Sequence, residues 1–219
     1  ASNIEIGTNE EGQATVTVEL ASASQSALKQ TMVYTIDGSG AVTLNATVDA
    51  TGTSLGRYMR IGTCMELPEG YENIEWYGEG PVESYSDRIE FARVGRYTST
   101  VSDMFYPFLY TQDTGNLVGT KWFTVTDPSK KSALAVTTAD TVEVSALHFT
   151  VEDLDQAVHP YELNPLKETV LSVNYGSMGS GCEDWGAGML SDYMIPNNQA
   201  YTYEYTLVPY TTDNDVMEV

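Results

Sequence analysis

Two stretches of the chain alternate apolar and polar residues strictly, the pattern of a strand with one buried face. Residues 14–21 read Ala-Thr-Val-Thr-Val-Glu-Leu-Ala, and residues 42–48 read Val-Thr-Leu-Asn-Ala-Thr-Val. Between them, residues 32–36 form a largely apolar run that enters the turn sequence Asp-Gly-Ser-Gly at 37–40. The glycines supply the φ values that a tight hairpin needs. We therefore predict three strands here, the last two joined by a hairpin.

Six further segments are rich in β-branched, aromatic and other apolar residues and are predicted to be strands. They are residues 60–65, 122–126, 134–137, 142–149, 169–175 and 203–208. The one good helix start is Thr150, which can cap free amides ahead of Glu152 and Asp153. Pro160 stops that helix shortly afterwards. The sequence thus predicts an all-β antiparallel protein with one short helix.

The charge of the chain limits its partners. Ten Lys and Arg residues stand against 31 Asp and Glu residues, a net charge of −21. Nucleic acid and anionic membrane surfaces both need clustered basic residues, so we expect neither as a partner. No apolar run reaches the roughly 18 residues of a membrane-spanning helix. The low Lys content with abundant Thr, Ser and Tyr leans towards a secreted or cell-surface bacterial protein, and a cytoplasmic one is also compatible.

Cysteine usage and the known nucleotide and metal motifs point to no cofactor in this chain. Cys64 and Cys182 are too few for a disulfide scaffold and have no metal-ligand spacing. The sequence is compatible with one disulfide between them and equally with two free thiols. No glycine-rich nucleotide loop follows a predicted strand, and no calcium-binding ligand ladder occurs. We expect neither a metal nor a nucleotide cofactor here.

The segment of residues 76–88 is too irregular for a helix or a plain strand. It reads Trp-Tyr-Gly-Glu-Gly-Pro-Val-Glu-Ser-Tyr-Ser-Asp-Arg. Gly78 and Gly80 permit positive φ or close backbone approach, and Pro81 fixes its own φ and restricts the residue before it. We predict an ordered loop.

Charged residues of this loop allow two interpretations. In the first, Glu83, Asp87 and Arg88 form a structural network folded over a buried Trp76. In the second, Glu79 and Glu83 form a catalytic pair, because retaining glycoside hydrolysis needs two carboxylates about 5 Å apart. We favour the structural network.

The residue pattern of this segment and its flanks resembles that of a known family. The pattern Arg-x-Gly, Leu-Pro, then Trp-x-Gly-x-Gly-Pro-x-Glu-x-Tyr-x-Asp-Arg is met in order by Arg60, Gly62, Leu67, Pro68, Trp76, Gly78, Gly80, Pro81, Glu83, Tyr85, Asp87 and Arg88. Later matches include Gly115-Asn116, Trp122 and the run His159-Pro160-Tyr161-Glu162-Leu163. Together they resemble the C-terminal domain of lactose-operon-type β-galactosidases of glycoside hydrolase family 2. The resemblance runs from about residue 37 to residue 209.

The resemblance implies a specific architecture. The family domain is a large β-sandwich of the galactose-mutarotase type, with two antiparallel sheets face to face. It implies one domain over residues 1–210 that lacks the first strands of the family domain, followed by an acidic, flexible tail over 211–219. Because missing strands leave open sheet edges, we expect a tendency to form homo-oligomers.

The resemblance also implies a division of labour. In the family, both catalytic glutamates lie in a separate (β/α)8 barrel, which often binds Mg²⁺ and Na⁺. No glutamate here has the sequence surroundings of those residues, so we expect no catalytic residue in this chain. The parent enzyme is expected to hydrolyse terminal β-D-galactosides with retention, and this domain to support the barrel and meet the galactoside only through the parent.

One loop carries a role in the family. Within Gly179-Ser180-Gly181-Cys182-Glu183-Asp184-Trp185-Gly186, the tryptophan Trp185 matches the position that reaches the sugar site, and Asp184 precedes it. The flat face of an indole suits the apolar face of a sugar ring. The loop departs from the common family spelling after Asp184, which leaves its shape open. The competing interpretation is a core tryptophan.

Two other classes of function stay open. A stand-alone carbohydrate-binding module predicts galactoside binding by the isolated chain. An aldose 1-epimerase needs a histidine and a glutamate, and His159 with Glu162 offers the residue types without the motif. The resemblance assigns His159 a structural role instead, and a shared fold does not transfer chemistry.

Overall fold

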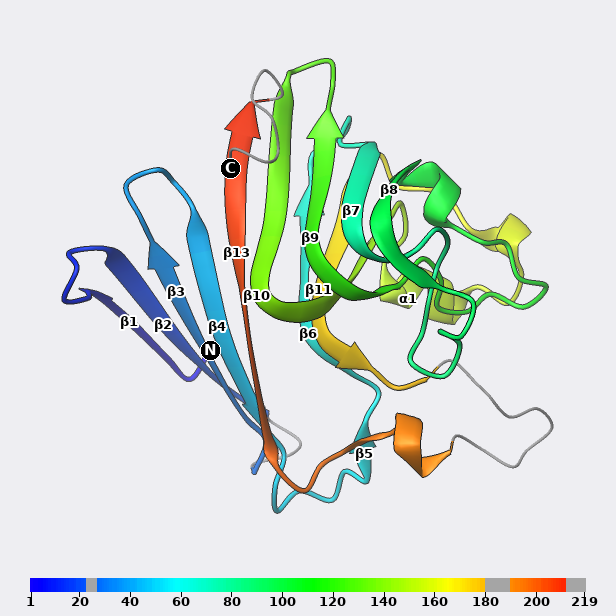
Figure 1. Cartoon of the computed structure of the whole chain (residues 1–219). Helices are drawn as coiled ribbons and strands as arrows, with labels where there is room; N and C mark the ends of the chain where they lie inside the picture. Colours follow the sequence, from blue (N-terminus) through cyan, green and yellow to red (C-terminus); the bar gives the residue numbers. More distant parts are fainter. Residues whose placement is uncertain (23–26, 180–189, 212–219) are drawn as a thin grey trace.

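The computed structural model describes residues 1–22, 27–179 and 190–211 (Figure 1). Within these ranges the chain is almost entirely β. The strands are β1 (Asn3–Thr8), β2 (Ala14–Ala21), β3 (Lys29–Ile36), β4 (Val42–Asp49), β5 (Arg57–Tyr58), β6 (Arg60–Leu67), β7 (Asn73–Gly80), β8 (Arg93–Thr100), β9 (Leu117–Asp127), β10 (Ser132–Leu147), β11 (Thr169–Ser177), β12 (Ile195–Pro196) and β13 (Ala200–Thr211). The helices are α1 (Val151–Gln156) and three 3-10 turns, η1 (Ser102–Met104), η2 (Pro160–Glu162) and η3 (Ser191–Tyr193). The predicted all-β class is confirmed.

Eleven strands form one antiparallel sheet in the order β1-β2-β3-β4-β13-β10-β9-β7-β8, and β11 joins it by pairing with both β10 and β6. The long strand β10 makes this possible. Its first half pairs with β13 and β9, and its second half pairs with β11 after register shifts between Thr137 and Val144. β10 therefore belongs to two layers, and β11 and β6 lie behind β13 and β10 (Figure 1).

The core lies between these two layers. The hydroxyls of Thr63 on β6 and Tyr205 on β13 are 2.7 Å apart, which fixes how closely the layers approach. Around this contact the buried apolar side chains come from both layers. They include Leu44, Ile61, Trp76, Phe123, Val136, Leu171, Val173 and Tyr205, each at most 3% exposed. Burial on this scale is the main stabilising term of the fold.

The alternation predicted for residues 42–48 is confirmed. Leu44, Ala46 and Val48 are buried, and the polar residues between them face outward. There they form a ladder with β13 in which each polar residue hydrogen-bonds its opposite neighbour. The pairs are Thr43 with Thr206 (2.9 Å), Asn45 with Glu204 (3.0 Å) and Thr47 with Thr202 (2.8 Å). Such cross-strand pairs fix the register of the two strands.

The predicted helix start is also confirmed, with a capping box at Thr150. Its hydroxyl accepts a hydrogen bond from the backbone N–H of Asp153 (3.1 Å), whose carboxylate accepts one from the N–H of Thr150 (2.9 Å). The helix ends at Gln156, four residues before Pro160. The capping box places α1 directly after the end of β10.

The prediction that residues 76–88 form an irregular loop is wrong for its first part, because Trp76 to Gly80 lie within β7. The glycines are needed for close approach and not for positive φ. A β-carbon on Gly78 would lie 2.9 Å from the Cα of Thr120, and one on Gly80 would overlap the ring of Tyr97. Trp76 itself is fully buried, as predicted, and donates its indole N–H to the Glu79 carbonyl (3.0 Å).

Two long strands, β1 and β8, were not predicted. β1 is exposed along its whole length, and β8 carries two arginines and a glycine, so neither has a clean buried face in sequence. Both pair on one side only, and β6 pairs only with β11. The expected association through open edges remains a prediction. Cys64 on β6 has a free thiol, whereas Cys182 and the acidic tail from residue 212 lie outside the described residues.

No helix in the described part of the chain is long and apolar enough to cross a membrane.

Glu72, just before β7, ties three elements together. Its carboxylate accepts a hydrogen bond from the backbone N–H of Ser102 in η1 (3.0 Å) and lies 2.7 Å from Nε2 of His148, just after β10. The other ring nitrogen of His148 lies 2.8 Å from the Glu168 carbonyl. Partial burial opposes ionisation, but the contacts with Ser102 and His148 outweigh it and lower the pKa of Glu72.

We predict that Glu72→Gln destabilises the chain at neutral pH. A carboxyl whose pKa falls on folding stabilises the fold above its ordinary value of 4.5, and this contribution is lost as the pH falls through the lowered pKa. Urea unfolding from neutral to acidic pH should show the variant and the wild type converging at low pH. Glu69→Gln, at a side chain 69% exposed, is the control and should track the wild type throughout. A gap that does not depend on pH would contradict the role of this carboxylate.

Candidate functional site

A cavity of about 600 Å³ lies where the second part of the motif segment meets α1 and the ends of β6 and β11. Its walls combine charged, hydroxyl and thioether groups with an aliphatic floor. The side chains that face it include Met59, Arg60, Tyr85, Thr111, Asp113, Leu154 and Met178. A concave site that mixes apolar walls with a few convergent polar groups is typical of small-molecule binding.

Arg60 is the centre of the polar wall. Its guanidinium binds the Asp113 carboxylate at 2.5 Å, and its Nε donates to the Ser177 hydroxyl at 3.3 Å. The same Asp113 oxygen accepts a hydrogen bond from the Tyr85 hydroxyl at 3.1 Å. Segments that lie far apart in sequence thus meet at one ion pair.

The electrostatics of this wall follow from burial. Burial and the neighbouring carboxylates of Asp113 and Glu83 raise the pKa of Tyr85 well above its usual range, so its hydroxyl stays a hydrogen-bond donor. Burial opposes the charge of Arg60, but Asp113 outweighs it and raises the guanidinium pKa. The Arg60 side chain is 24% and the Asp113 side chain 37% exposed, so water screens the pair in part.

The charged motif residues contact one another and the neighbouring chain, and their structural role remains a prediction. Arg88 binds Glu83 at 3.2 Å, and its guanidinium lies over the Tyr85 ring at 5.0 Å. The other Glu83 oxygen accepts from the Thr114 hydroxyl (2.8 Å) and the Gly115 N–H (2.7 Å). Glu83 is therefore fully engaged in holding the loop.

A second buried polar group lies beneath the cavity, and sequence reasoning missed it. Glu143 of β10 is 7% exposed and accepts a hydrogen bond from the Asn116 amide (3.0 Å), which also donates to the Ser84 carbonyl (3.1 Å). Burial raises the pKa of Glu143, although hydrogen bonds from Ser177 and Asn116 favour its ionised form. A charged residue inside the run Val-Glu-Val at 142–144 was the available signal. No pattern in the sequence marked Asp113, the partner of Arg60, as a residue of this site.

The motif and the glycine-rich loop meet at the rim of the cavity. A β-carbon on Gly179 would lie 2.6 Å from the carboxyl carbon of Asp87, so Asp87 packs directly on the chain there. Residues 180–189 follow, and Asp184 and Trp185 lie among them, outside the described residues. The structure therefore places the start of the Trp185 loop and says nothing of the indole.

His159 does not line the cavity. Its ring stacks on Tyr161 (5.2 Å between centroids) and lies 5.6 Å from the ring of Tyr110. Its Nδ1 is 3.6 Å from the Glu162 carboxylate, which also accepts from the Val158 N–H. These contacts lie within and beside the η2 turn, and the structural role that the resemblance assigns to His159 remains a prediction.

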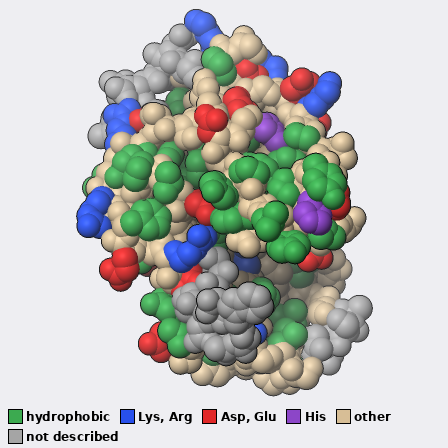
Figure 2. All heavy atoms as spheres, turned by 90° about the vertical axis from the view of Figure 1, so that its right-hand side faces the viewer, with side chains coloured by type: hydrophobic (Ala, Val, Ile, Leu, Met, Phe, Trp, Pro, Cys, Tyr) green, Lys and Arg blue, Asp and Glu red, His purple; other side chains and the backbone are tan. Residues whose placement is uncertain are grey.

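An exposed group of residues next to the cavity, which we call the aromatic patch, consists of Leu109, Tyr110, Val158, His159 and Tyr161. Tyr161 is 81% and Leu109 76% exposed. The patch shares a wall with the cavity, because Thr111 lines the cavity and donates its N–H to the Val158 carbonyl (3.1 Å). Hydrophobic side chains gather on this side of the molecule (Figure 2). Exposed apolar patches of this kind mark interaction surfaces.

Comparisons with known proteins agree with one another. A family model described as "Beta galactosidase small chain" matches residues 2–207. The β-galactosidase of Streptococcus thermophilus is 30% identical over 179 residues, which cover 81% of this chain and 17% of that protein. β-Galactosidase BgaC of Bifidobacterium adolescentis is 32% identical over 197 residues, 85% of this chain and 18% of that protein. The chain spans less than a fifth of the length of these curated relatives.

Among solved structures, a GalM/aldose epimerase homologue from C. elegans is similar to 95% of this chain. The match covers 68% of that protein with a TM-score of 0.49 and 12% identity.

We predict that Arg60→Met lowers the free energy of unfolding by about 1–3 kcal/mol, since it leaves the Asp113 carboxylate without its ion-pair partner and the Ser177 hydroxyl without its donor. Arg60→Lys should recover little, because an ammonium cannot serve Asp113 and Ser177 in the same planar geometry. Urea unfolding measures both. Arg57→Met, at an exposed arginine three residues earlier, is the matched control. Equal stability of the Arg60 and Arg57 variants would show that the ion pair adds nothing.

Proposed function

The chain belongs to the β-galactosidase small-chain family, and from this premise we propose that it is the accessory C-terminal β-domain of a larger β-galactosidase of glycoside hydrolase family 2. The parent enzyme hydrolyses terminal β-D-galactosides with retention. The observation that carries the proposal is the family match over residues 2–207 of a chain that spans about a sixth of its relatives. Most of each relative, and with it room for a catalytic barrel, lies outside this region.

Three carboxylates at or near the cavity, those of Asp113, Glu143 and Glu83, are engaged in contacts that support a non-catalytic role. Retaining hydrolysis needs one carboxyl as a proton donor and a second, about 5–5.5 Å away, free to attack the sugar. Asp113 is neutralised by Arg60 and Tyr85, and Glu143 is held by Asn116 beneath the cavity. Glu83 is bound by Arg88 and Thr114. Groups committed to such contacts stabilise a loop and are poorly placed to attack an anomeric carbon.

The aromatic patch supports a docking role. Its occupant, we infer, is the catalytic barrel of the same polypeptide, since relatives carry more than four-fifths of their length beyond the matched region. The exposed rings of Tyr110 and Tyr161 offer large contact area at low entropic cost. The domain thereby braces the barrel from one side.

The position of the Trp185 loop completes the proposal. The loop leaves the chain at Gly179, on the rim of a cavity that shares a wall with the aromatic patch. A barrel seated on the patch therefore lies beside Gly179, the residue after which this loop begins. We propose that Trp185, next to Asp184, contributes its ring to the rim of the sugar site.

The docking role predicts that Leu109→Asp and Tyr161→Asp destabilise the longer enzyme but not the isolated chain. Each places a charge in the contact with the barrel, where it loses its water, whereas in the isolated chain the same position stays solvated. The midpoint temperature of thermal unfolding should fall by at least about 2 °C, and only in the longer enzyme. Ile6→Asp, at a side chain 82% exposed on β1, is the control and should change neither. Equal effects in both contexts would contradict docking through the patch.

The sugar-rim role predicts that Trp185→Ala raises KM for a nitrophenyl galactoside in the longer enzyme by about tenfold, because stacking on the sugar is lost. Trp185→Phe should recover part of the loss. Steady-state kinetics at several substrate concentrations separate KM from kcat. The 219-residue chain, assayed alone, should release no nitrophenol. An unchanged KM would remove Trp185 from the sugar site, and release by the chain alone would overturn the accessory role.

A further inference from the structure

The outer face of β8, β7 and β9 presents a regular grid of side chains far from the cavity. The pairing places three rows side by side, each running from β8 through β7 to β9. The rows are Arg96, Tyr77 and Trp122; then Thr98, Glu75 and Thr124; then Thr100, Asn73 and Thr126. Because successive rows are two residues apart, all nine side chains point to the same side of the sheet.

The first row forms an aromatic platform. The rings of Tyr77 and Trp122 lie 6.4 Å apart with planes within 20° of each other. Tyr77 is 40% exposed. The guanidinium of Arg96 lies 5.8 Å from the Trp122 ring centroid and forms an ion pair with Glu75, so the charge at this end is balanced.

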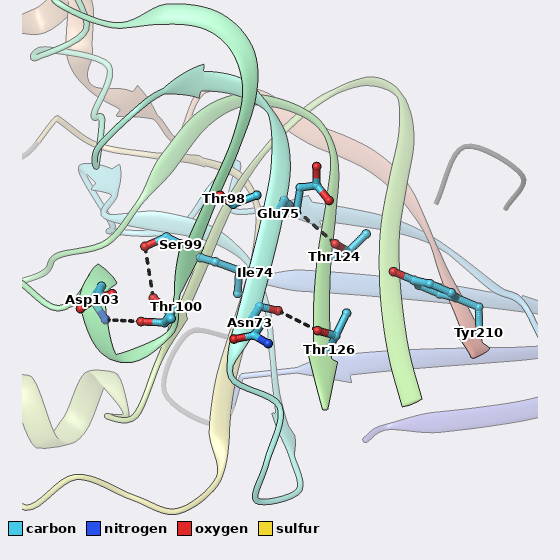
Figure 3. Close-up of a pocket in the computed structure, with 10 residues that line it drawn as sticks. All are labelled: Asn73, Ile74, Glu75, Thr98, Ser99, Thr100, Asp103, Thr124, Thr126 and Tyr210. Atoms are coloured by element: carbon cyan, nitrogen blue, oxygen red, sulfur yellow. Dashed lines mark hydrogen bonds between the residues drawn. The ribbon is translucent and has the colours of Figure 1, made fainter. Parts of the chain in front are cut away.

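The other two rows line a groove of about 440 Å³, which Figure 3 shows across the three strands. Its walls are hydroxyls, the Asn73 amide, the carboxylates of Glu75 and Asp103, and the ring of Tyr210. Thr126, which is half-buried, donates to the Asn73 carbonyl at 3.4 Å, which leaves its oxygen lone pairs for an incoming donor. Thr124 makes the same bond to the Glu75 carbonyl but is buried. From the platform to the last row the face extends about 13 Å, which is longer than one sugar ring.

The chemistry of this face selects its ligand. β7 and β9 are interior strands whose backbone groups are already paired, so a peptide could add as a strand only beside the edge strand β8 and not across the three rows. The net charge of −21 disfavours nucleic acid. The face offers a pair of aromatic rings followed by hydroxyl, amide and carboxylate groups, and the carboxylates of Glu75 and Asp103 disfavour an anionic sugar. A chain of neutral sugar rings matches both parts, since each ring has an apolar face and a rim of hydroxyls.

We propose that this face binds a neutral oligosaccharide, with Tyr77 and Trp122 packed against its ring faces and the threonine rows hydrogen-bonding its hydroxyls. The site is separate from the cavity and independent of the accessory role. It gives the domain a glycan-binding activity of its own. A protein that holds a sugar chain here keeps that chain near any site elsewhere in the same polypeptide.

Calorimetry on the 219-residue chain tests the proposal with β-1,4-linked galactotetraose and cellotetraose as the neutral probes. At least one tetrasaccharide should bind, and lactose more weakly, because it covers only part of the face. Tyr77→Ala and Trp122→Ala should each lower the affinity by about tenfold. Trp122→Phe should keep a measurable part of it and guards against a loss caused by misfolding. Tyr161→Ala, which removes an exposed ring from the opposite functional surface, is the matched control and should bind as the wild type does.

Two results would overturn the inference. One is the absence of binding by the wild-type chain to both tetrasaccharides at millimolar concentration. The other is binding that survives in Tyr77→Ala and Trp122→Ala, because the sugar would then lie elsewhere, for example in the cavity. Neither result bears on the accessory role, which depends on the longer enzyme and on Trp185.

Discussion

The structure depends on one strand that is buried in two different layers. β10 is 16 residues long, and its second half, from Val142 to Leu147, is buried on both faces. One face packs Val142, Val144 and Ala146 into the core between the layers. The other face carries Glu143 and Ser145 towards the motif segment. Because the same strand contributes residues to the core and to the polar wall of the cavity, the two cannot shift independently of each other.

The sequence allowed the strands with a clean pattern to be predicted, and the reason is physical. Residues 42–48 alternate because one side of the strand faces the core and the other lies on the outer face of the sheet, whereas residues 14–21 alternate in sequence although no residue of β2 is fully buried. The capping box at Thr150 could be predicted from the sequence because it is a local interaction within four consecutive residues. β8 could not be predicted, since no residue of the strand is fully buried and its arginines and glycine give no apolar alternation. β7 was mistaken for a loop because its glycines are there for close packing against Thr120 and Tyr97.

The candidate site was predictable only where motif residues carry it. Arg60, Glu83, Tyr85 and Arg88 belong to the recognised pattern, and the structure brings them to one wall. Asp113 and Glu143 complete that wall from distant segments, and no local rule connects either to Arg60. The aromatic platform depends in the same way on register, because Tyr77 and Trp122 are 45 positions apart in sequence and become neighbours only through the pairing of β7 with β9. Contacts of this kind are set by topology, which composition and periodicity do not encode.

The exposed edge strand β1 has a bearing on how the protein behaves in concentrated solution. Ile4 and Ile6 lie on that edge, 58% and 82% exposed, beside unpaired backbone groups. Such an edge is a template for stacking one copy on another. The strong negative charge opposes this by mutual repulsion, which fades near the isoelectric point of about 4.1 and in high salt. Repulsion between its carboxylates thus keeps this protein dispersed in solution. Acidification or a precipitating salt weakens that repulsion, and copies can then associate through the exposed edge of the β1–β2 hairpin.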